Sequence, residues 1–246
     1  MYREITGKPP AINLSYYKPT SRDGRPFMPV EFAVAAYRFG HSIIRPFYII
    51  NDSGIVNVFG RPDDTTRNLN GGRPIPTDLV IGWKNILPVD PTFPARKPRK
   101  IDTKLSLPLT SLPESVVPPP DPTVNLAIRN SLRGKHVGLP SGQRVAAAMR
   151  VNVLSNTALG LSSDPGWGGE APLWYYILKE AELAPYQGER LGPVGGRIVA
   201  EVLIGLLQRD PNSYLYLDPA WKPTPPIAPT TGQFTFVDLL KYAGAA

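Results

Sequence analysis

The sequence has 246 residues, 42% of them hydrophobic, which is enough for one domain with a sizeable core. It contains no apolar run near the ~18 residues that a membrane span needs, and residues 1–10 lack the apolar stretch of a secretory signal. The absence of cysteine excludes disulfides, thiolate nucleophiles and cysteine ligands for zinc or iron. These features predict a globular chain without a membrane span, and they do not fix its compartment.

The formal net charge of +7 would suit nucleic acid, anionic lipid or an acidic partner. However, the densest basic run, residues 96–104, lies in a proline-rich stretch without the interleaved aromatic residues of a nucleic-acid-binding surface. We therefore interpret this run as a solvated loop and expect no nucleic-acid partner.

Thirty prolines and 22 glycines divide the chain into short pieces. The sequence predicts a mainly α fold, in which helices are joined by long Pro/Gly-rich loops and at most one short hairpin is present. No internal repeat or boundary is visible, so we expect a single domain over residues 1–246. Residues 60–120 should be mostly loop, and residues 218–246 should form a tail.

The first regular segments are predicted before residue 60. A helix is expected from Glu31 to Pro46, because Pro29 and Glu31 suit its first turn and Pro46 ends it. Two β-prone runs between Phe47 and Phe59 flank a turn, which predicts a hairpin. Beyond them only a short helix is expected, from Asp78 to Leu87.

The second half is more regular, with helix starts marked by capping residues or prolines. One helix should begin at Asp121-Pro122 and carry Leu126 and Asn130 on one face. Further helices are predicted to begin at Ser141 (through Leu154), Pro172, Pro193 and Val237.

Arg38 and His41 lie three residues apart in the first predicted helix, hence on one face, and the chain has only two histidines. Imidazole is a good axial ligand for haem iron when its second nitrogen is held by a hydrogen bond. Asn130 is the best candidate for that partner, because it shares a helix face with Leu126 and a buried amide needs a partner. Its side-chain oxygen would accept from Nδ1–H of His41 and leave Nε2 for iron.

The segment EFAVAAYRFGHSIIRP, from Glu31 to Pro46, resembles the proximal haem-ligand helix of animal-type haem peroxidases, the peroxidase-cyclooxygenase superfamily. The motif of that helix is an arginine three residues before a Gly-His pair. The segment NLAIRNSLRGKHVGLPSG, from Asn125 to Gly142, is similar to the family helix of pattern LN-x-x-R-x-R-D-H-G-(L/I)-P, with Lys-His-Val in place of its Arg-Asp-His. With later helices that look like those of bacterial members, the resemblance covers about residues 25–216.

The resemblance implies roles for four residues. His41 would bind the iron of haem b, Asn130 would be the catalytic asparagine that hydrogen-bonds it, and Arg38 and Arg133 would approach the haem propionates. The implied activity is an oxidoreductase that uses hydrogen peroxide to oxidise an electron donor, in the response to oxidative stress. Fatty-acid dioxygenases of the superfamily carry a radical-forming tyrosine where this chain has Arg38, so peroxidase is favoured and dioxygenase is the alternative.

In the family the distal histidine and arginine lie far upstream of the proximal helix, and no Gln-x-x-x-His-Asp-like stretch is present here. We therefore expect the C-terminal, proximal half of a peroxidase domain, with little activity alone and with a distal half that is either supplied by another polypeptide or lost by truncation. A covalent haem link would use residues outside this sequence, and secretion would require a longer precursor. The alternatives are a non-catalytic haem-binding protein and a haem-free interaction remnant. His136 is expected to be structural or exposed.

Overall fold

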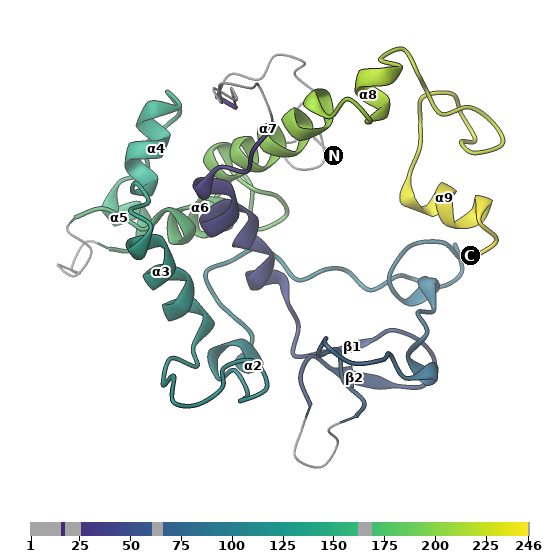
Figure 1. The fold of residues 1–246 in the computed structure, drawn as a ribbon, viewed down its shortest axis with the longest axis horizontal. Helices are drawn as coiled ribbons and strands as arrows, with labels where there is room; N and C mark the ends of the chain where they lie inside the picture. Colours follow the sequence, from purple (N-terminus) through teal and green to yellow (C-terminus); the bar gives the residue numbers. More distant parts are fainter. Residues whose placement is uncertain (1–15, 18–25, 61–65, 162–168, 246) are drawn as a thin grey trace. The chain divides into compact units, whose positions relative to one another are not determined.

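The computed structural model describes residues 16–17, 26–60, 66–161 and 169–245. In this part of the chain nearly all regular structure is helical, and the strands form one two-stranded sheet (Figure 1). This confirms the predicted mainly α class. The sequence shows no internal boundary, whereas the structure groups the chain into two compact units. Unit 1 contains residues 1–44 and 99–217, and unit 2 contains residues 45–98 and 218–246.

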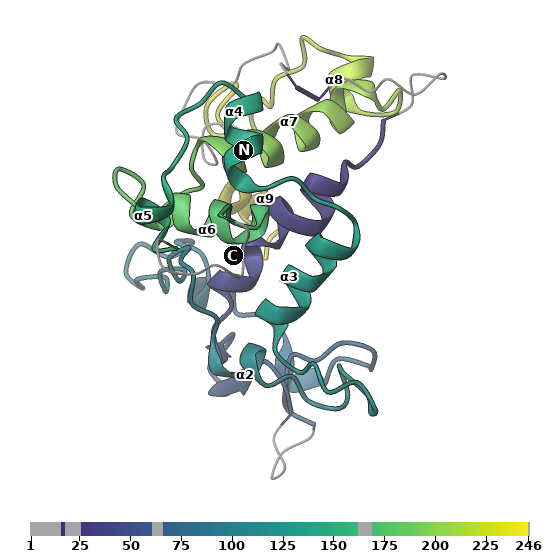
Figure 2. The same cartoon turned by 90° about the vertical axis from the view of Figure 1, so that its left-hand side faces the viewer.

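Unit 1 is a cluster of helices packed around one buried apolar helix, α6. Its helices are η1 (Glu31–Ala35), η2 (Ala36–Ile43), α2 (Leu107–Thr110), α3 (Leu126–His136), α4 (Gly142–Ala148), α5 (Asn156–Leu159), α6 (Leu173–Glu182), α7 (Pro193–Arg209) and α8 (Tyr214–Leu217). Helix α6 contacts η1, η2, α3, α4, α5 and α7. The η1–η2 segment and α3 run side by side in both views (Figures 1 and 2). Residues far apart in sequence therefore meet between η2, α3 and α6.

The core of unit 1 is built on α6. Its start agrees with the prediction, since Pro172 is the residue that precedes the first helical position. Tyr176, Ile177 and Leu178 are at most 1% exposed, and Leu173 lies beside them in the same cluster. Burial of each such side chain contributes about 1.5–3 kcal/mol. Helix α6 is thus the fixed element against which the site-bearing helices are placed.

The helix predicted from Glu31 to Pro46 differs from the one observed. A five-residue π-helix, η1, is followed by a 3₁₀-helix, η2, which ends at Ile43, and Ile44 is already extended. A proline ring disfavours helical geometry at the residue that precedes it, which helps to end the helix before Pro46. A 3₁₀-helix has three residues per turn, so side chains three apart are eclipsed. Arg38 and His41 consequently lie directly above one another on η2.

Helix α3 begins later than predicted. Asn125 is its N-cap, with the side-chain oxygen accepting from the amides of Ala127 and Ile128, whereas Asp121 was expected to begin the helix. The Asp121 carboxylate instead accepts from the Thr123 amide and from Arg129 of α3. An asparagine oxygen accepts from the free amides of a first turn as well as a carboxylate does. Asn125 therefore caps the helix in place of Asp121.

The remaining helix starts of unit 1 agree with the sequence. The Ser141 hydroxyl accepts from the Arg144 amide at the start of α4, and Pro193 is the first residue of α7. Helix α4 stops at Ala148 rather than reaching Leu154, and Arg150 after it has a positive φ of 53°. A non-glycine residue in that conformation cannot continue a right-handed helix.

Unit 2 contains the predicted hairpin. Strands β1 (Phe47–Ile49) and β2 (Ile55–Asn57) are antiparallel, with Tyr48 opposite Val56. The expected helix from Asp78 to Leu87 is instead two 3₁₀ turns, η3 (Thr77–Leu79) and η4 (Trp83–Asn85). The final helix, α9 (Phe236–Tyr242), begins with a reciprocal capping box between Thr235 and Asp238. Among the described residues, no helix combines the length and apolar character that crossing a membrane requires.

Candidate functional site

The structure brings together three of the four predicted site residues. Arg38 and His41 lie on η2, and Asn130 lies on α3, where it is 1% exposed. Nη1 of Arg38 donates to Oδ1 of Asn130 at 2.8 Å, and Nδ2 of Asn130 lies 2.9 Å from Nδ1 of His41. The amide of Asn130 therefore lies between the guanidinium and the imidazole and contacts both.

The arginine decides which way the Asn130 amide faces. A guanidinium has only donors, so the amide atom that meets Arg38 must be the oxygen. The amide nitrogen then donates to Nδ1 of His41, which must carry a lone pair, and in the neutral ring the proton is on Nε2. This geometry differs from our expectation that the Asn130 oxygen would accept from Nδ1–H.

The backbone of η2 is held by a contact that sequence analysis missed. Nε1 of Trp174, on α6, donates to the carbonyl of Arg38 at 3.1 Å, and Trp174 is 6% exposed. The Arg38 Nε also donates to the carbonyl of Ala33, at 3.3 Å. A buried tryptophan usually finds an acceptor for its N–H. The tryptophan in the apolar sequence of α6 was therefore the signal from which such a hydrogen bond could have been predicted. These contacts fix the position from which Arg38 reaches Asn130.

The site is positively charged, and the described residues offer it no carboxylate partner. Burial lowers the pKa of Arg38, and Arg133 lowers it further by charge repulsion. Burial likewise lowers the pKa of His41, with a second contribution from Arg38. Within the described part of the chain, neither Arg38 nor Arg133 forms an ion pair with Asp or Glu. Two arginines without acidic partners make this surface suitable for an anion.

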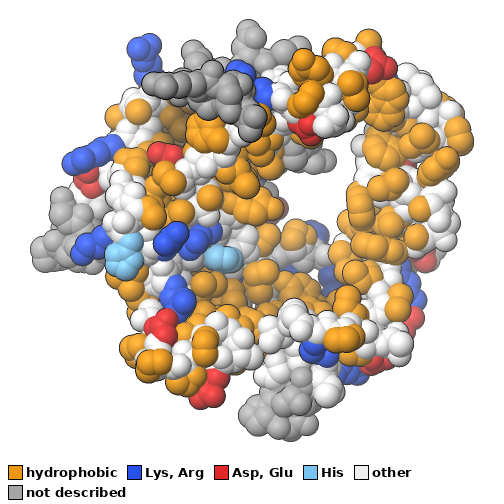
Figure 3. Space-filling model, viewed as in Figure 1, with side chains coloured by type: hydrophobic (Ala, Val, Ile, Leu, Met, Phe, Trp, Pro, Cys, Tyr) orange, Lys and Arg blue, Asp and Glu red, His pale blue; other side chains and the backbone are white. Residues whose placement is uncertain are grey.

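Arg133 and His136 stand apart from the hydrogen-bonded trio. Arg133 is exposed on α3 and acts on Arg38 through its charge. His136 is exposed at the last position of α3. Figure 3 shows Lys, Arg and His side chains together on this face of unit 1, among apolar side chains. His41 itself is half-buried.

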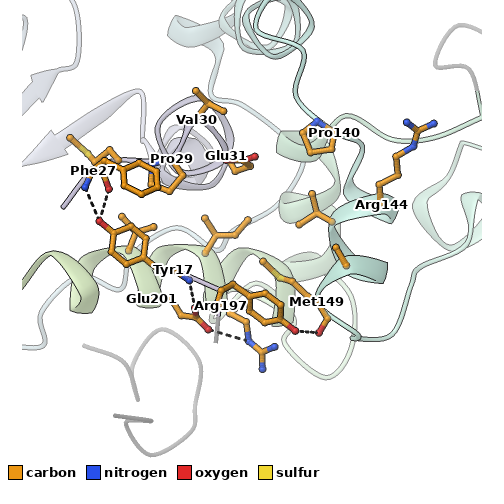
Figure 4. A pocket seen from close by; sticks show the side chains of 16 residues that line it. Tyr17, Phe27, Pro29, Val30, Glu31, Pro140, Arg144, Met149, Arg197 and Glu201 are labelled. Carbon is orange, nitrogen blue, oxygen red and sulfur yellow. Dashed lines mark hydrogen bonds and ion pairs between the residues drawn. The ribbon is translucent and has the colours of Figure 1, made fainter. Parts of the chain in front are cut away.

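Unit 1 contains two cavities in its described part, of which one reaches the site through Asn130, and His41 lines neither of them. One, of about 1160 Å³, is bounded by α3, α4 and α6 and includes Asn130 in its wall. The other, of about 760 Å³, lies between α4, α7 and the segment that leads into η1 (Figure 4). Several polar groups in its wall contact one another: Oε2 of Glu201 accepts from the amides of Tyr16 and Tyr17, and the Tyr16 hydroxyl donates to the Met149 carbonyl.

A second residue missed from the sequence is Glu180 of α6. Its carboxylate accepts from the amides of Val194 and Gly195 at the start of α7 and is 5% exposed. Burial raises its pKa to about 7, against the opposing effect of these hydrogen bonds. Leu173, Ile177 and Glu180 follow the i, i+4, i+7 spacing, which already placed Glu180 on the apolar face.

Comparisons with known proteins give a limited result. The sequence matches no family profile and no curated protein. Among solved structures, the chain is similar to peroxidase A from Dictyostelium discoideum, with a TM-score of 0.49 and 18% identity over 76% of this chain. The chain spans 36% of the length of that protein. At this identity and TM-score, the likeness decides neither the family nor the activity.

Proposed function

We propose that this chain binds haem b and forms the proximal side of a peroxidase-type site, with His41 as the iron ligand. Asn130 holds the second ring nitrogen of that ligand, and Arg38 and Arg133 receive the haem propionates. The observation that carries the proposal is the hydrogen-bonded series Arg38, Asn130, His41, which joins two helices that the sequence motifs had singled out separately. A surface arginine and a surface histidine would not need a buried amide between them.

The side chains present suit a haem. The group carries two carboxylates and needs one neutral nitrogen from the protein, and the site offers two arginines and one imidazole. No cluster of three His, Asp or Glu residues that could hold a bare metal ion occurs in the described ranges. A porphyrin supplies four ligands itself, so one histidine is sufficient. One adjustment is required, because the proton of His41 must leave Nε2 before this nitrogen can bind iron.

The roles of the residues follow from their chemistry. When bound, the haem supplies the iron that reacts with peroxide and accepts electrons from a donor. His41 binds the metal, Asn130 fixes the orientation of the ring, and Arg38 with Arg133 neutralises propionate charge. A neutral amide leaves the ligand less imidazolate-like than a carboxylate partner would. We assign no distal base or distal arginine to this chain, so our proposal includes a second polypeptide that supplies them.

A hemin titration tests the proposal. The purified chain should shift the Soret absorbance of hemin with one site per chain, and His41→Ala should abolish the shift. His136→Ala is the matched control, because it removes the other histidine from an exposed position and should leave binding unchanged. Binding that survives His41→Ala, or that requires His136, would contradict the assignment. No shift by the wild-type chain would favour a haem-free interaction module instead.

Peroxidase activity is tested separately, by adding peroxide and a phenolic donor to the loaded chain. We expect little turnover, since moving the proton between the peroxide oxygens requires a distal base. Robust turnover by this chain alone would show that a distal group lies within it. Complete inactivity even with a complementing polypeptide would favour the non-catalytic haem-binding alternative.

The dioxygenase alternative has weaker support. The position at which the dioxygenases carry their radical-forming tyrosine is occupied in this chain by Arg38, whose guanidinium contacts Asn130. The neighbouring Tyr37 is 59% exposed, and its ring stacks on Phe32 at 5.0 Å between centroids. Neither position places a phenol hydroxyl at the predicted proximal site.

A further inference from the structure

We propose that Arg38 sets the tautomer of His41 through the amide of Asn130, and that a carboxylate captured by Arg38 reverses this tautomer. Arg38 is in this view a positioning residue, because it acts on the imidazole only through Asn130. The first half of the inference rests on the geometry of the free chain. The second half rests on the proposed function, since it identifies the carboxylate as a porphyrin propionate.

The hydrogen-bond series permits one arrangement of protons. Arg38 donates to the Asn130 oxygen, the Asn130 nitrogen donates to Nδ1 of His41, and the ring proton is left on Nε2. If the amide turned over, its N–H groups would face the guanidinium, and neither tautomer of His41 would remove that mismatch. Asn130 is 1% exposed, so water cannot relieve it. The buried amide therefore transmits the donor character of Arg38 to the imidazole.

This tautomer is unsuited to iron binding. The metal needs a lone pair on the nitrogen it binds, and in the free chain the ring offers Nε2–H on the side away from Asn130. The arrangement in which Nε2 binds a metal needs the proton on Nδ1 and an acceptor beside it. Asn130 provides that acceptor only after its oxygen is released from Arg38.

A carboxylate is the kind of group that releases it. The described residues give Arg38 no acidic partner, and the nearby charge of Arg133 repels it. Its present side-chain bonds go to a neutral amide and, at 3.3 Å, to the carbonyl of Ala33. A charge-assisted bond to a carboxylate is stronger than either. Arg38 is half-buried, so an anion can reach its outer guanidinium edge.

The proton balance of the change is simple. When Arg38 turns to the carboxylate, the Asn130 amide turns over, and its oxygen faces Nδ1. His41 loses the Nε2 proton to solvent and gains a proton from solvent at Nδ1, which then donates to the Asn130 oxygen. The ring stays neutral throughout, and Nε2 is left with its lone pair. Binding of the propionate by Arg38 is thereby coupled to the ability of His41 to bind iron.

Nitrogen NMR tests the first half on the free chain. With ¹⁵N-labelled histidine, above the ordinary pKa of the ring, long-range proton correlations distinguish the protonated nitrogen from the unprotonated one. We expect Nδ1 of His41 to be unprotonated in the wild type and in Arg38→Lys, which keeps a cationic donor. Arg38→Leu should shift both nitrogens towards the opposite tautomer. Wild-type protein with the proton on Nδ1, or a folded Arg38→Leu chain with unchanged shifts, would overturn the inference.

A porphyrin without iron tests the second half on the unmodified chain, and so does not depend on whether a variant folds. Protoporphyrin IX has the two propionates of haem but no metal, and its dimethyl ester lacks both charges. We expect protoporphyrin IX to reverse the His41 tautomer and the ester to leave it unchanged. Binding of protoporphyrin IX without a change of tautomer would refute the coupling. Hemin binding through His41 could still hold in that case, so the two proposals fail separately.

Discussion

The side-chain nitrogen of Asn130 lies 2.9 Å from Nδ1 of His41, although 89 positions separate the two residues in the sequence. The contact joins η2 to α3, and Asn130, one of its two partners, is 1% exposed. A buried polar group without a partner is costly, so each of these side chains depends on the other for its place. The site is therefore part of the structure that holds the two helices together.

Asn130→Ala should weaken both folding and haem binding. It leaves His41 and Arg38 without their shared partner and should lower the free energy of unfolding by about 1–3 kcal/mol, measured by urea denaturation. Hemin affinity should fall as well, because the imidazole is no longer oriented. Asn125→Ala is the control on the same helix. It removes the N-cap of α3, should cost about 1 kcal/mol, and should leave hemin affinity close to wild type. Equal effects of both variants on hemin would argue against a specific role for Asn130.

Trp174→Phe should loosen η2 where Arg38 is attached to it. The variant removes the donor to the Arg38 carbonyl and part of a buried ring, and should cost about 1–3 kcal/mol of stability. We expect a measurable fall in hemin affinity, by titration. Tyr175→Phe, at the next position, loses a hydrogen bond to the Leu159 carbonyl and should leave hemin affinity unchanged. A Trp174→Phe chain that binds hemin like the wild type would show that this backbone contact is dispensable.

Gly142→Ala should destabilise the packing of α4 on α6. A Cβ at this position would overlap the Cβ and Cγ of Tyr176, which is fully buried and whose hydroxyl accepts from the Leu154 amide. We expect a loss of about 2–4 kcal/mol in thermal or urea unfolding. The matched change Gly134→Ala, in α3, meets only the Leu139 side chain at 3.4 Å and should gain up to about 1 kcal/mol. Similar stabilities for the two variants would contradict the close approach of the helices.

Glu180→Gln should change how stability depends on pH. The folded pKa of Glu180 is raised to about 7 from the ordinary value of 4.5, so between these pH values the folded chain holds a proton that the unfolded chain has lost. The contribution of this group to the free energy of unfolding is therefore largest below pH 4.5. It falls as the pH rises to about 7 and does not change further above that pH. Glutamine keeps an acceptor for the Val194 amide without the charge.

The variant should therefore be more stable than the wild type at alkaline pH, by up to about 3 kcal/mol relative to their difference at acid pH. Urea unfolding of both proteins across this range measures the effect. Glu182→Gln is the control: this side chain forms a partly exposed pair with Lys179, and its loss should change stability by less than about 1 kcal/mol at any pH. A pH profile of Glu180→Gln parallel to that of the wild type would show that folding does not raise the pKa of Glu180.

Several elements of the fold could be predicted because their signals are local. Ser141, Pro172 and Pro193 mark helix starts through bonds or constraints that act within one turn, and the structure agrees with each. The turn between Phe47 and Phe59 likewise forms a hairpin. Where two local signals compete, prediction failed: Asp121 and Asn125 are both good capping residues, and propensity alone does not choose between them.

By itself, the sequence determined the mainly helical class, most helix starts, and the pairing of Arg38 with His41 on one face. Only the tertiary structure decided the winding of η2, the division into two units, and the direction in which Asn130 faces. The physical reason is that an amide has two ends of similar shape. Which end meets His41 depends on a donor that arrives from elsewhere in the chain, and here that donor is Arg38.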